Sequence, residues 1–392
     1  MSLTQDGDLL CAELIRNEIP PSCFERSTTI SLAYLARDCV YAASLVWLAL
    51  KIDLIPSAPV RLLLWITYGF LQGCVGTGLW IVGHECGHGA FSDSPLLNDI
   101  VGWVVHSSLM VPYFSWKITH ARHHRYTNNI EKDTAFVPET WKSAKIPETS
   151  SSTTASPMPL GGNLAAWGEM IHDTPIYTTF SLLRHQLLGW QAYLLFYVTA
   201  GSDSIPSSSG VATSKSSVQS HFDPFSALFR PSQRHLIVLS DLGLILVGTA
   251  LYFLGQSLGG FKIMLLYVIP YLWVHHWLVA ITYLHHTHLT VPHFADSSWS
   301  FVDGALSTVD RNFGFIGRHF FHNIIDYHVV HHLFPKIPFY KAEEATKAII
   351  PILGARYNRD DRPFLRSLIE TYTTCDYVYD TKLNGVFHWV RK

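Results

Sequence analysis

The sequence predicts an all-α integral membrane protein with four transmembrane helices, arranged as two hairpins, and a cytosolic helical cap that holds a metal site. Three observations predict this class. Charged residues make up 15% of the 392 residues, against roughly 25% in soluble domains, while hydrophobic residues reach 48%. Several long stretches carry no charged residue, and eight histidines fall into three tight clusters that follow or flank those stretches.

Three segments lack Asp, Glu, Lys and Arg throughout and have about 20 residues, the length that crosses the hydrocarbon core of a bilayer as a helix. They are Leu62–Gly83, Leu242–Phe261 and Ile263–Leu284. Only Lys262 separates the last two, which predicts a helical hairpin with its turn around that lysine. A weaker segment, Leu32–Leu50, contains one Arg and one Asp and pairs with the first segment across a short turn with two prolines. A large buried helical core is the alternative, which two hairpins of this length disfavour.

Positive charge sets the expected orientation, because Lys and Arg are enriched in cytosolic loops. The two hairpin turns are short and carry few of them, whereas the middle and C-terminal segments carry many. Both termini and all three histidine clusters are therefore expected on the cytosolic side, where the clusters can meet. The five parts are an N-terminal segment, a first hairpin, a segment with two clusters, a second hairpin and a segment with the third cluster. Their predicted bounds are 1–31, 32–83, 84–235, 236–284 and 285–392.

The histidine clusters have helical spacing. A pair at i, i+4 and a triple at i, i+3, i+4 share one face of a helix, so each cluster is expected to present its imidazole nitrogens to one point. Eight neutral ligands without a Cys-x-x-Cys pattern predict a site for two metal ions. Iron suits histidine-rich sites with open positions, and zinc also takes imidazole. Scattered structural histidines are the alternative. The clusters are His84-Glu-Cys-Gly-His88, His120-Ala-Arg-His123-His124 and His328-Val-Val-His331-His332.

Other segments indicate surface organisation. Val101–Phe114 and His185–Ala200 are apolar but interrupted, so they fit either the membrane interface or buried cap helices. Ser150–Pro159 and Gly201–Ser220 are rich in Ser, Thr, Pro and Gly and are expected to be loops. The N-terminus shows neither a secretory signal nor a transit peptide. The six cysteines have no pairing rhythm, and no basic stripe predicts nucleic-acid binding.

The clusters and their surroundings resemble the three histidine boxes of the membrane-bound fatty acid desaturase family, most closely its Δ12/ω3 (oleate desaturase-like) branch of plants and fungi. The resemblance covers nearly the whole chain, roughly residues 19–391. Four stretches carry it: His84-Glu-Cys-Gly-His-Gly-Ala-Phe-Ser-Asp93, Val111-Pro-Tyr-Phe-Ser-Trp116, Thr282-Tyr-Leu-His-His-Thr-His288 and His331-His-Leu-Phe-Pro335.

The resemblance implies a ligand set for two iron ions (Fe2+). It adds one histidine near the end of the fourth membrane helix, which is His286 here. His285 stands where many relatives carry Gln and is expected beside the ligands rather than among them. The implied metal-binding and catalytic residues are His84, His88, His120, His123, His124, His286, His328, His331 and His332.

The resemblance also implies the reaction. Two ferrous ions would activate dioxygen for the removal of hydrogens from adjacent methylenes, which acid–base residues cannot attack, and a narrow dry channel would select the carbons. The chain lacks the His-Pro-Gly-Gly of a fused cytochrome b5 domain, so electrons are expected from separate cytochrome b5 and its NADH-dependent reductase. The expected substrate is an acyl-lipid or acyl-CoA in the endoplasmic reticulum membrane. The expected outcome is a cis double bond that converts an oleoyl into a linoleoyl chain.

Polar residues near the boxes are candidates for supporting roles. Glu85, Asp133 and Asp326 are candidates to orient imidazoles through their second nitrogen. Asn323 is a candidate to hold a water near the metal, and a turn or structural role is the alternative for each. The remaining histidines are expected to be structural: His106, His172, His185, His221, His235, His275, His276, His288, His293, His319, His322 and His388.

The sequence leaves the reaction outcome open. Gly83 precedes the first box where ordinary Δ12 relatives usually carry Ala, and Leu289 replaces a common Pro. A methyl group added at Gly83 is expected to crowd the pocket beside His84, although a Gly there also eases helix packing. The alternatives are an acetylenase, an ω3 desaturase or another divergent enzyme that acts on a specialised acyl or polyketide-derived secondary-metabolite chain. A non-enzymatic membrane protein and a zinc transporter are more remote, because all eight box histidines are present and lie at or beyond helix ends.

Overall fold

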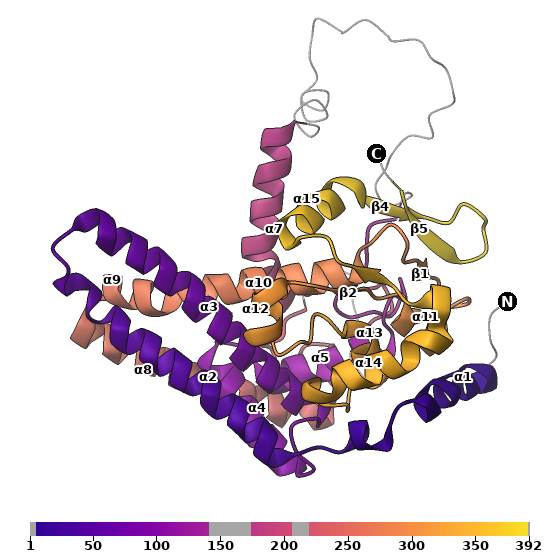
Figure 1. Ribbon diagram of the computed structural model, residues 1–392, viewed down its shortest axis with the longest axis horizontal. Coiled ribbons are helices and arrows are strands. Elements are labelled where there is room, and N and C mark those ends of the chain that lie inside the picture. The colour runs from indigo at the N-terminus through magenta and orange to yellow at the C-terminus, as the bar shows by residue number, and fades with distance from the viewer. Residues whose placement is uncertain (1–4, 141–173, 206–218, 391–392) are drawn as a thin grey trace, which may run out of the picture.

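The computed structural model describes residues 5–140, 174–205 and 219–390 (Figure 1). The predicted loop Ser150–Pro159, His172 and most of Gly201–Ser220 lie outside these residues. The described part is mainly helical, but it also contains short strands, which the predicted all-α class did not include. Its few strands are short and form a three-stranded antiparallel sheet and a two-stranded parallel pair.

Long helices form one half of the molecule (Figure 1). α3 packs against α2 on one side and α10 on the other, and α8 packs against the shorter helices α4 and α5. A short helix, α9, and a π-helical turn at Met264–Val268 connect α8 to α10. The bounds are α2 Thr28–Ala49, α3 Ala58–His88, α4 Pro95–Ser108, α5 Tyr113–Arg125, α7 Pro175–Phe196, α8 Arg234–Leu258, α9 Gly260–Ile263 and α10 Ile269–His286.

By length and composition, three helical segments in the described residues can cross a membrane: Ala58–His88, Pro231–Leu258 and Gly260–His286. They contain the three uncharged segments of the sequence almost entirely. The fourth predicted span corresponds to α2, which is not among these three, so four spans stay a prediction. The acidic side chain of α2 is not exposed: Asp38 is buried and accepts a 2.8 Å hydrogen bond from His322 Nε2.

The second hairpin turns at Gly259, close to Lys262, so α8 ends at Leu258 rather than at the sequence-based boundary of Phe261. Gly259 has φ +89°, a backbone conformation that favours glycine, and it separates α8 from α9. Lys262 lies within α9 and forms an ion pair with Asp53, in the turn between α2 and α3. The two turns therefore lie together at one end of the long helices, at the left of Figure 1, far from the helices of the cap.

Two predicted apolar segments have different bounds in the structure. The segment 101–114 is divided between α4 and α5, because Val111 and Pro112 lie between these two helices. Residues 185–196 of the second segment belong to the longer helix α7, and residues 197–200 follow its end. α7 packs against α10 and carries large exposed apolar side chains, among them Ile176, Phe180 and Leu183.

The cap forms the other half of the molecule and contains the C-terminal part of the chain together with α1. Its core packs α13 and α1 each against α11 and α14, through buried side chains such as Val302, Val329 and Ile349. The bounds are α1 Gln5–Glu18, α11 Phe301–Leu306, α12 Gly314–His319, α13 His328–Leu333, α14 Phe339–Leu353, α15 Phe364–Thr374, β1 His293–Phe294, β2 Asp310–Arg311, β3 Arg359–Asp360, β4 Tyr377–Tyr379 and β5 Val386–Val390.

Candidate metal centre

The first histidine box occupies the last turn of α3. His84 and His88 are four residues apart, so both face the same side of the helix. The helix ends there because Gly89 adopts a left-handed conformation with φ +71° and its N–H bonds to the carbonyl of Cys86. The chain can then turn away without covering the two imidazoles.

The second and third boxes are also helical, but each triple is divided between two places. An α-helix advances by about 100° per residue, so residues i+3 and i+4 lie on opposite sides of residue i. His120 and His124 point to one group of nitrogens, whereas His123 points to another. His331 likewise joins the first group and His332 the second. The expectation that each cluster presents all its nitrogens to one point is therefore wrong for both triples.

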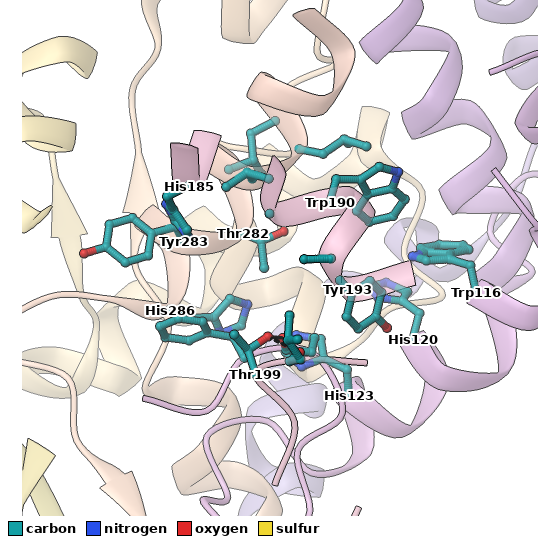
Figure 2. A pocket seen from close by; sticks show the side chains of 18 of the residues that line it. Trp116, His120, His123, His185, Trp190, Tyr193, Thr199, Thr282, Tyr283 and His286 are labelled. Carbon is teal, nitrogen blue, oxygen red and sulfur yellow. Dashed lines mark hydrogen bonds between the residues drawn. The ribbon is translucent and has the colours of Figure 1, made fainter. Parts of the chain in front are cut away.

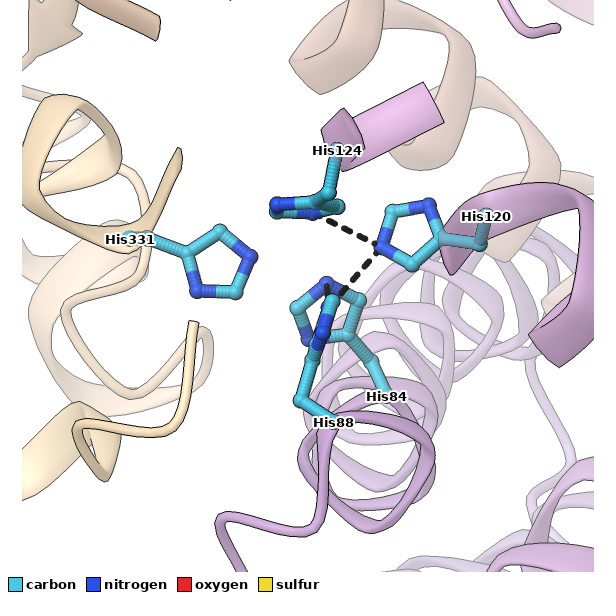
Figure 3. A group of neighbouring side chains, drawn as sticks. All are labelled: His84, His88, His120, His124 and His331. Carbon is cyan, nitrogen blue, oxygen red and sulfur yellow. Dashed lines mark hydrogen bonds between the residues drawn. The ribbon is translucent and has the colours of Figure 1, made fainter. Parts of the chain in front are cut away.

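The first histidine group brings together five side chains from three helices (Figure 3). The Nε2 atom of His88 lies 3.2 Å from that of His84 and 3.1 Å from that of His120. The Nε2 atoms of His120 and His124 are 3.1 Å apart. One ligand atom from each residue lies within 4.8 Å of all the others. The group consists of His84, His88, His120, His124 and His331.

The second histidine group lies next to the first. His123, His286 and His332 have ligand atoms within 4.8 Å of one another. His328 joins them, because its Nε2 is 2.9 Å from Nε2 of His332 and 3.4 Å from Nε2 of His286. We include it in the second histidine group. The nine histidines predicted from the sequence and its family resemblance thus lie together, five in one group and four in the other.

The donor set fits metal ions. Burial lowers the pKa of His120, His124, His328, His331 and His332 well below its usual range, so these imidazoles are neutral. A neutral imidazole has one donor and one acceptor nitrogen. Where the Nε2 atoms of several imidazoles lie next to one another, hydrogen bonds between the rings cannot satisfy all of these atoms. Nitrogens about 3 Å apart have the spacing of neighbouring ligands around an ion with metal–nitrogen bonds of about 2.1 Å. A cation at the centre of each group would satisfy the converging lone pairs.

The second ring nitrogens have specific partners in two cases. Asp133 Oδ1 accepts a hydrogen bond of 2.7 Å from His123 Nδ1–H. Thr127 Oγ1 lies 3.0 Å from His332 Nδ1. Glu85 is less well placed, because its Oε1 is 3.4 Å from His84 Nδ1 while its Oε2 accepts a bond from the backbone of the cap at residue 339. Asp133 therefore has the geometry predicted for it, and Thr127 is a contact that the sequence analysis missed.

Other candidates from the sequence lie elsewhere. Among the described residues, Asp326 forms no hydrogen bond or ion pair with a histidine, and its Oδ2 has no partner. Asn323 Oδ1 is also buried without a described partner. His285 lies beside the second group, with its ring 4.3 Å from that of His328, but its nitrogens lie 2.6 and 2.9 Å from the carbonyls of residues 281 and 325. This agrees with its expected place next to the ligands.

A cavity of about 510 Å³ adjoins both histidine groups (Figure 2). Most of its wall is apolar or aromatic, with Trp116, Trp190 and Tyr193 among the lining residues. It extends along α7 to exposed side chains such as Arg184 and Leu188. The candidate ligand histidines that line it are His84, His120, His123, His286, His328 and His332. An extended apolar molecule in this cavity would reach both groups.

Comparison with known proteins identifies similar chains. The family model for fatty acid desaturases matches residues 59–362. The chain is 44% identical over 375 residues to an oleate hydroxylase of Claviceps purpurea, covering 93% of this chain and 76% of that protein. It is 39% identical over 369 residues to a Delta(12) fatty acid desaturase of Mortierella isabellina, covering 93% and 87%. It is 38% identical over 382 residues to an oleoyl-12-hydroxylase of Ricinus communis, covering 96% and 89%.

Proposed function

Because this chain belongs to the fatty acid desaturase family, we propose that it introduces a cis double bond into an oleoyl chain and so makes a linoleoyl chain. Membership of this family makes the chain an oxidoreductase of lipid metabolism. The cavity is the observation that supports the proposal best. Its walls suit an acyl chain, and histidines of both groups line it, so a methylene in the cavity lies beside both candidate metal sites.

The proposed roles of the residues follow from their positions. The first histidine group would hold one iron and the second group the other. When bound, the irons would supply the activation of dioxygen that unactivated C–H bonds require. Asp133 keeps a proton on Nδ1 of His123, which leaves its Nε2 lone pair free to bind metal. The aromatic wall of the cavity excludes water and fixes which carbons lie beside the histidines.

The reaction balances with two external electrons. Desaturation converts –CH2–CH2– into –CH=CH–, and dioxygen takes up the two hydrogens, two electrons and two protons to form two waters. We propose that the electrons come from cytochrome b5 and its NADH-dependent reductase. An acyl-lipid would supply the chain.

We also propose an endoplasmic reticulum location with four spans and both termini in the cytosol. In support, the turns of both predicted hairpins lie together, while the histidines of α3 and α10 lie in the last turns of these helices, at their other ends. A glycosylation acceptor on a spacer within Ile52–Pro59 is then expected to be modified. An acceptor at Ser208, outside the described residues, is expected to stay unmodified, and its modification would contradict this topology.

Hydroxylation of the same chain is a second candidate, favoured by the 44% identity to the Claviceps purpurea oleate hydroxylase. It replaces one C–H by C–OH and releases one water, with the same dioxygen and two electrons. The two outcomes need the same cavity and the same metals, so small shifts of the acyl chain against the histidine groups would separate them.

Expression in a yeast that makes oleate but no polyunsaturated lipid tests both candidates. Gas chromatography with mass spectrometry of total fatty acids is expected to reveal a new diene with its second double bond on the methyl side of the first. A hydroxylated C18 chain would favour the second candidate, and a triple bond would favour the acetylenase alternative. A control strain carrying His331→Ala, matched for membrane-bound protein, is expected to show none of these. If the wild type makes no new product from oleate or linoleate, the proposal fails and a specialised acyl chain becomes the substrate to test.

A further inference from the structure

Strand β2, the dipeptide Asp310–Arg311, contacts the ends of two helices that carry histidines of the second group. α10 ends at His286, and α13 begins at His328. We propose that Asp310 and Arg311 are positioning residues that set the geometry of the second histidine group, Asp310 through α13 and Arg311 through α10. The inference rests on the proposed function, because it treats this group as a metal site.

Asp310 anchors the first turn of α13. Its Oδ1 accepts a 2.7 Å hydrogen bond from the backbone N–H of Val329, the residue after His328. First-turn N–H groups have no partner within their own helix, and Tyr327 at the N-cap position supplies no side-chain bond. The hydroxyl of Tyr357 donates to Asp310 Oδ2 at 2.7 Å and fixes the carboxylate. Because α13 has only six residues, this anchor controls where its first histidine lies.

Arg311 anchors the last turn of α10. Its Nε donates to the carbonyl of Leu284 at 2.8 Å, and one terminal nitrogen donates to the carbonyl of Thr287 at 3.2 Å. These carbonyls lie on either side of His286, at a helix end whose last carbonyls lack partners within the helix and attract positive charge. The guanidinium also forms an ion pair with Asp360 on β3, and Arg311 is only 1% exposed. The end of α10 is thereby tied to the β2–β3 pair.

The two anchors are consecutive residues, so they couple the two helix ends. His286 and His328 are 42 residues apart in sequence, yet their Nε2 atoms are 3.4 Å apart. Parallel pairing of β2 with β3 holds the dipeptide itself. A site of this kind tolerates displacements of only about 0.5 Å. The β2 dipeptide supplies contacts to both helices at the residues next to the ligands.

The first histidine group depends less on these anchors. Four of its five residues come from the last turns of α3 and α5, and only His331 comes from α13. Loss of the anchors is therefore expected to affect the second group more than the first. This asymmetry distinguishes a positioning role from general destabilisation of the fold.

The test uses the full chain reconstituted with iron under anaerobic conditions. Asp310→Ala removes the acceptor for Val329, and Arg311→Met removes the donors to α10. Asp310→Asn keeps a carbonyl oxygen for the same N–H and serves as the conservative rescue. Asp8→Ala is the matched control, because Asp8 accepts bonds of 2.8 and 3.0 Å from the N–H groups of residues 301 and 302 in the first turn of α11, which carries no box histidine. Iron per chain and hydrogen–deuterium exchange of segments 284–287 and 328–330 are measured.

Wild type, Asp310→Asn and Asp8→Ala are expected to bind about two irons, and Asp310→Ala and Arg311→Met about one. In the iron-free protein, exchange is expected to rise at 328–330 in Asp310→Ala and at 284–287 in Arg311→Met. Product formation is expected to fall about 10- to 100-fold in these two variants, as for other residues that orient metal ligands. If Arg311→Met fails to accumulate, Arg311→Lys replaces it. A lysine has a single terminal nitrogen and cannot bond to both carbonyls and to Asp360 as the guanidinium does.

Two full irons with unchanged exchange in both anchor variants would overturn the inference. So would a loss of iron in Asp8→Ala equal to that in Asp310→Ala, because the effect would then be one of general stability. A wild type without iron would instead overturn the proposed function. The exchange of the iron-free variants would then still decide whether β2 holds the two helix ends.

Discussion

Asp133 and His123 form a buried pair in which the carboxylate accepts a 2.7 Å hydrogen bond from the imidazole Nδ1–H. Asp133 also accepts backbone N–H bonds from Asn128 at 3.0 Å and from Ala135 at 2.9 Å, so its own position is fixed. It is the clearest example here of a carboxylate that orients a candidate metal ligand. The contact links the loop after α5 to the second histidine group.

Asp133→Asn is expected to lower activity or the iron affinity of the second group by about 10- to 100-fold, because the amide oxygen is a weaker acceptor for the imidazole Nδ1–H. Iron content and product formation at limiting iron measure the effect. Asp296→Asn is the control, since Asp296 pairs with Lys132 and Asn129 near the same loop without touching a box histidine. Equal effects of the two variants would contradict the orienting role.

The division of the second box predicts different consequences for neighbouring residues. His124→Ala is expected to remove the iron of the first group and His123→Ala that of the second, leaving about one iron per chain in each case. Both variants, together with His84→Ala and His331→Ala, are expected to lose activity while still inserting into membranes. Mössbauer spectra of the two single-iron forms should differ.

His388→Ala, at an exposed position on β5, is the control for these substitutions. Full turnover in any of the box variants would refute the assignment of two irons to these histidines. Identical spectra of the His123 and His124 variants would refute the division into two groups.

Gly83 lies against His106, not against the cavity beside His84, which corrects the expectation from the sequence. A Cβ at Gly83 would lie 2.2 Å from His106 Cδ2, and the His106 ring contacts the Trp80 carbonyl at 3.0 Å and stacks on the Trp80 ring. Gly83→Ala is therefore expected to destabilise the protein by about 1–3 kcal/mol through overpacking. Because Trp80 lines the cavity, the product ratio is expected to change as well.

Thermal unfolding in detergent and fatty acid analysis measure these two effects. Gly248→Ala is the matched control: a Cβ there meets no atom within 4 Å, so it is expected to stabilise α8 by up to about 1 kcal/mol. An unchanged midpoint and product ratio for Gly83→Ala would show that His106 moves aside without cost.

Burial of His293 predicts a pH dependence of stability. The side chain is fully buried, neither ring nitrogen has a described partner, and burial lowers its pKa to about 3. The unfolded chain takes up this proton near pH 6.5, before the folded protein does. The contribution of neutral His293 to the free energy of unfolding is therefore fully present above about pH 6.5, and it is lost as the pH falls toward about 3.

His293→Phe is expected to reduce the slope of unfolding free energy against pH, below about pH 6.5, by up to about 1.4 kcal/mol per pH unit. Its neighbours Phe136 and Trp389 suit the added ring. Unfolding of the metal-free protein at several pH values below 7 measures the slope, with wild type and His388→Phe as references. A variant slope equal to that of wild type would contradict the prediction.

The sequence by itself determined the features that depend on local periodicity and composition. Spans of uncharged residues indicated three of the long helices, and i, i+4 spacing indicated that His84 and His88 share a face. The motifs also carried the family resemblance, which the comparisons confirmed. From that resemblance came the prediction of His286, whose Nε2 lies 3.4 Å from that of His328. These properties require only neighbours within one or two helical turns.

The tertiary structure decided how the histidines divide and what holds them. His123 and His124 are adjacent in sequence, but His124 joins histidines of α3 and α13, whereas His123 joins histidines of α10 and α13. Asp326 is two residues from His328 and forms no bond with a histidine in the described residues, whereas Asp310, 18 residues away, holds the turn that His328 begins. The physical reason is that a helix fixes only the angle between side chains. Which neighbour each side chain meets depends on packing between segments far apart in the chain.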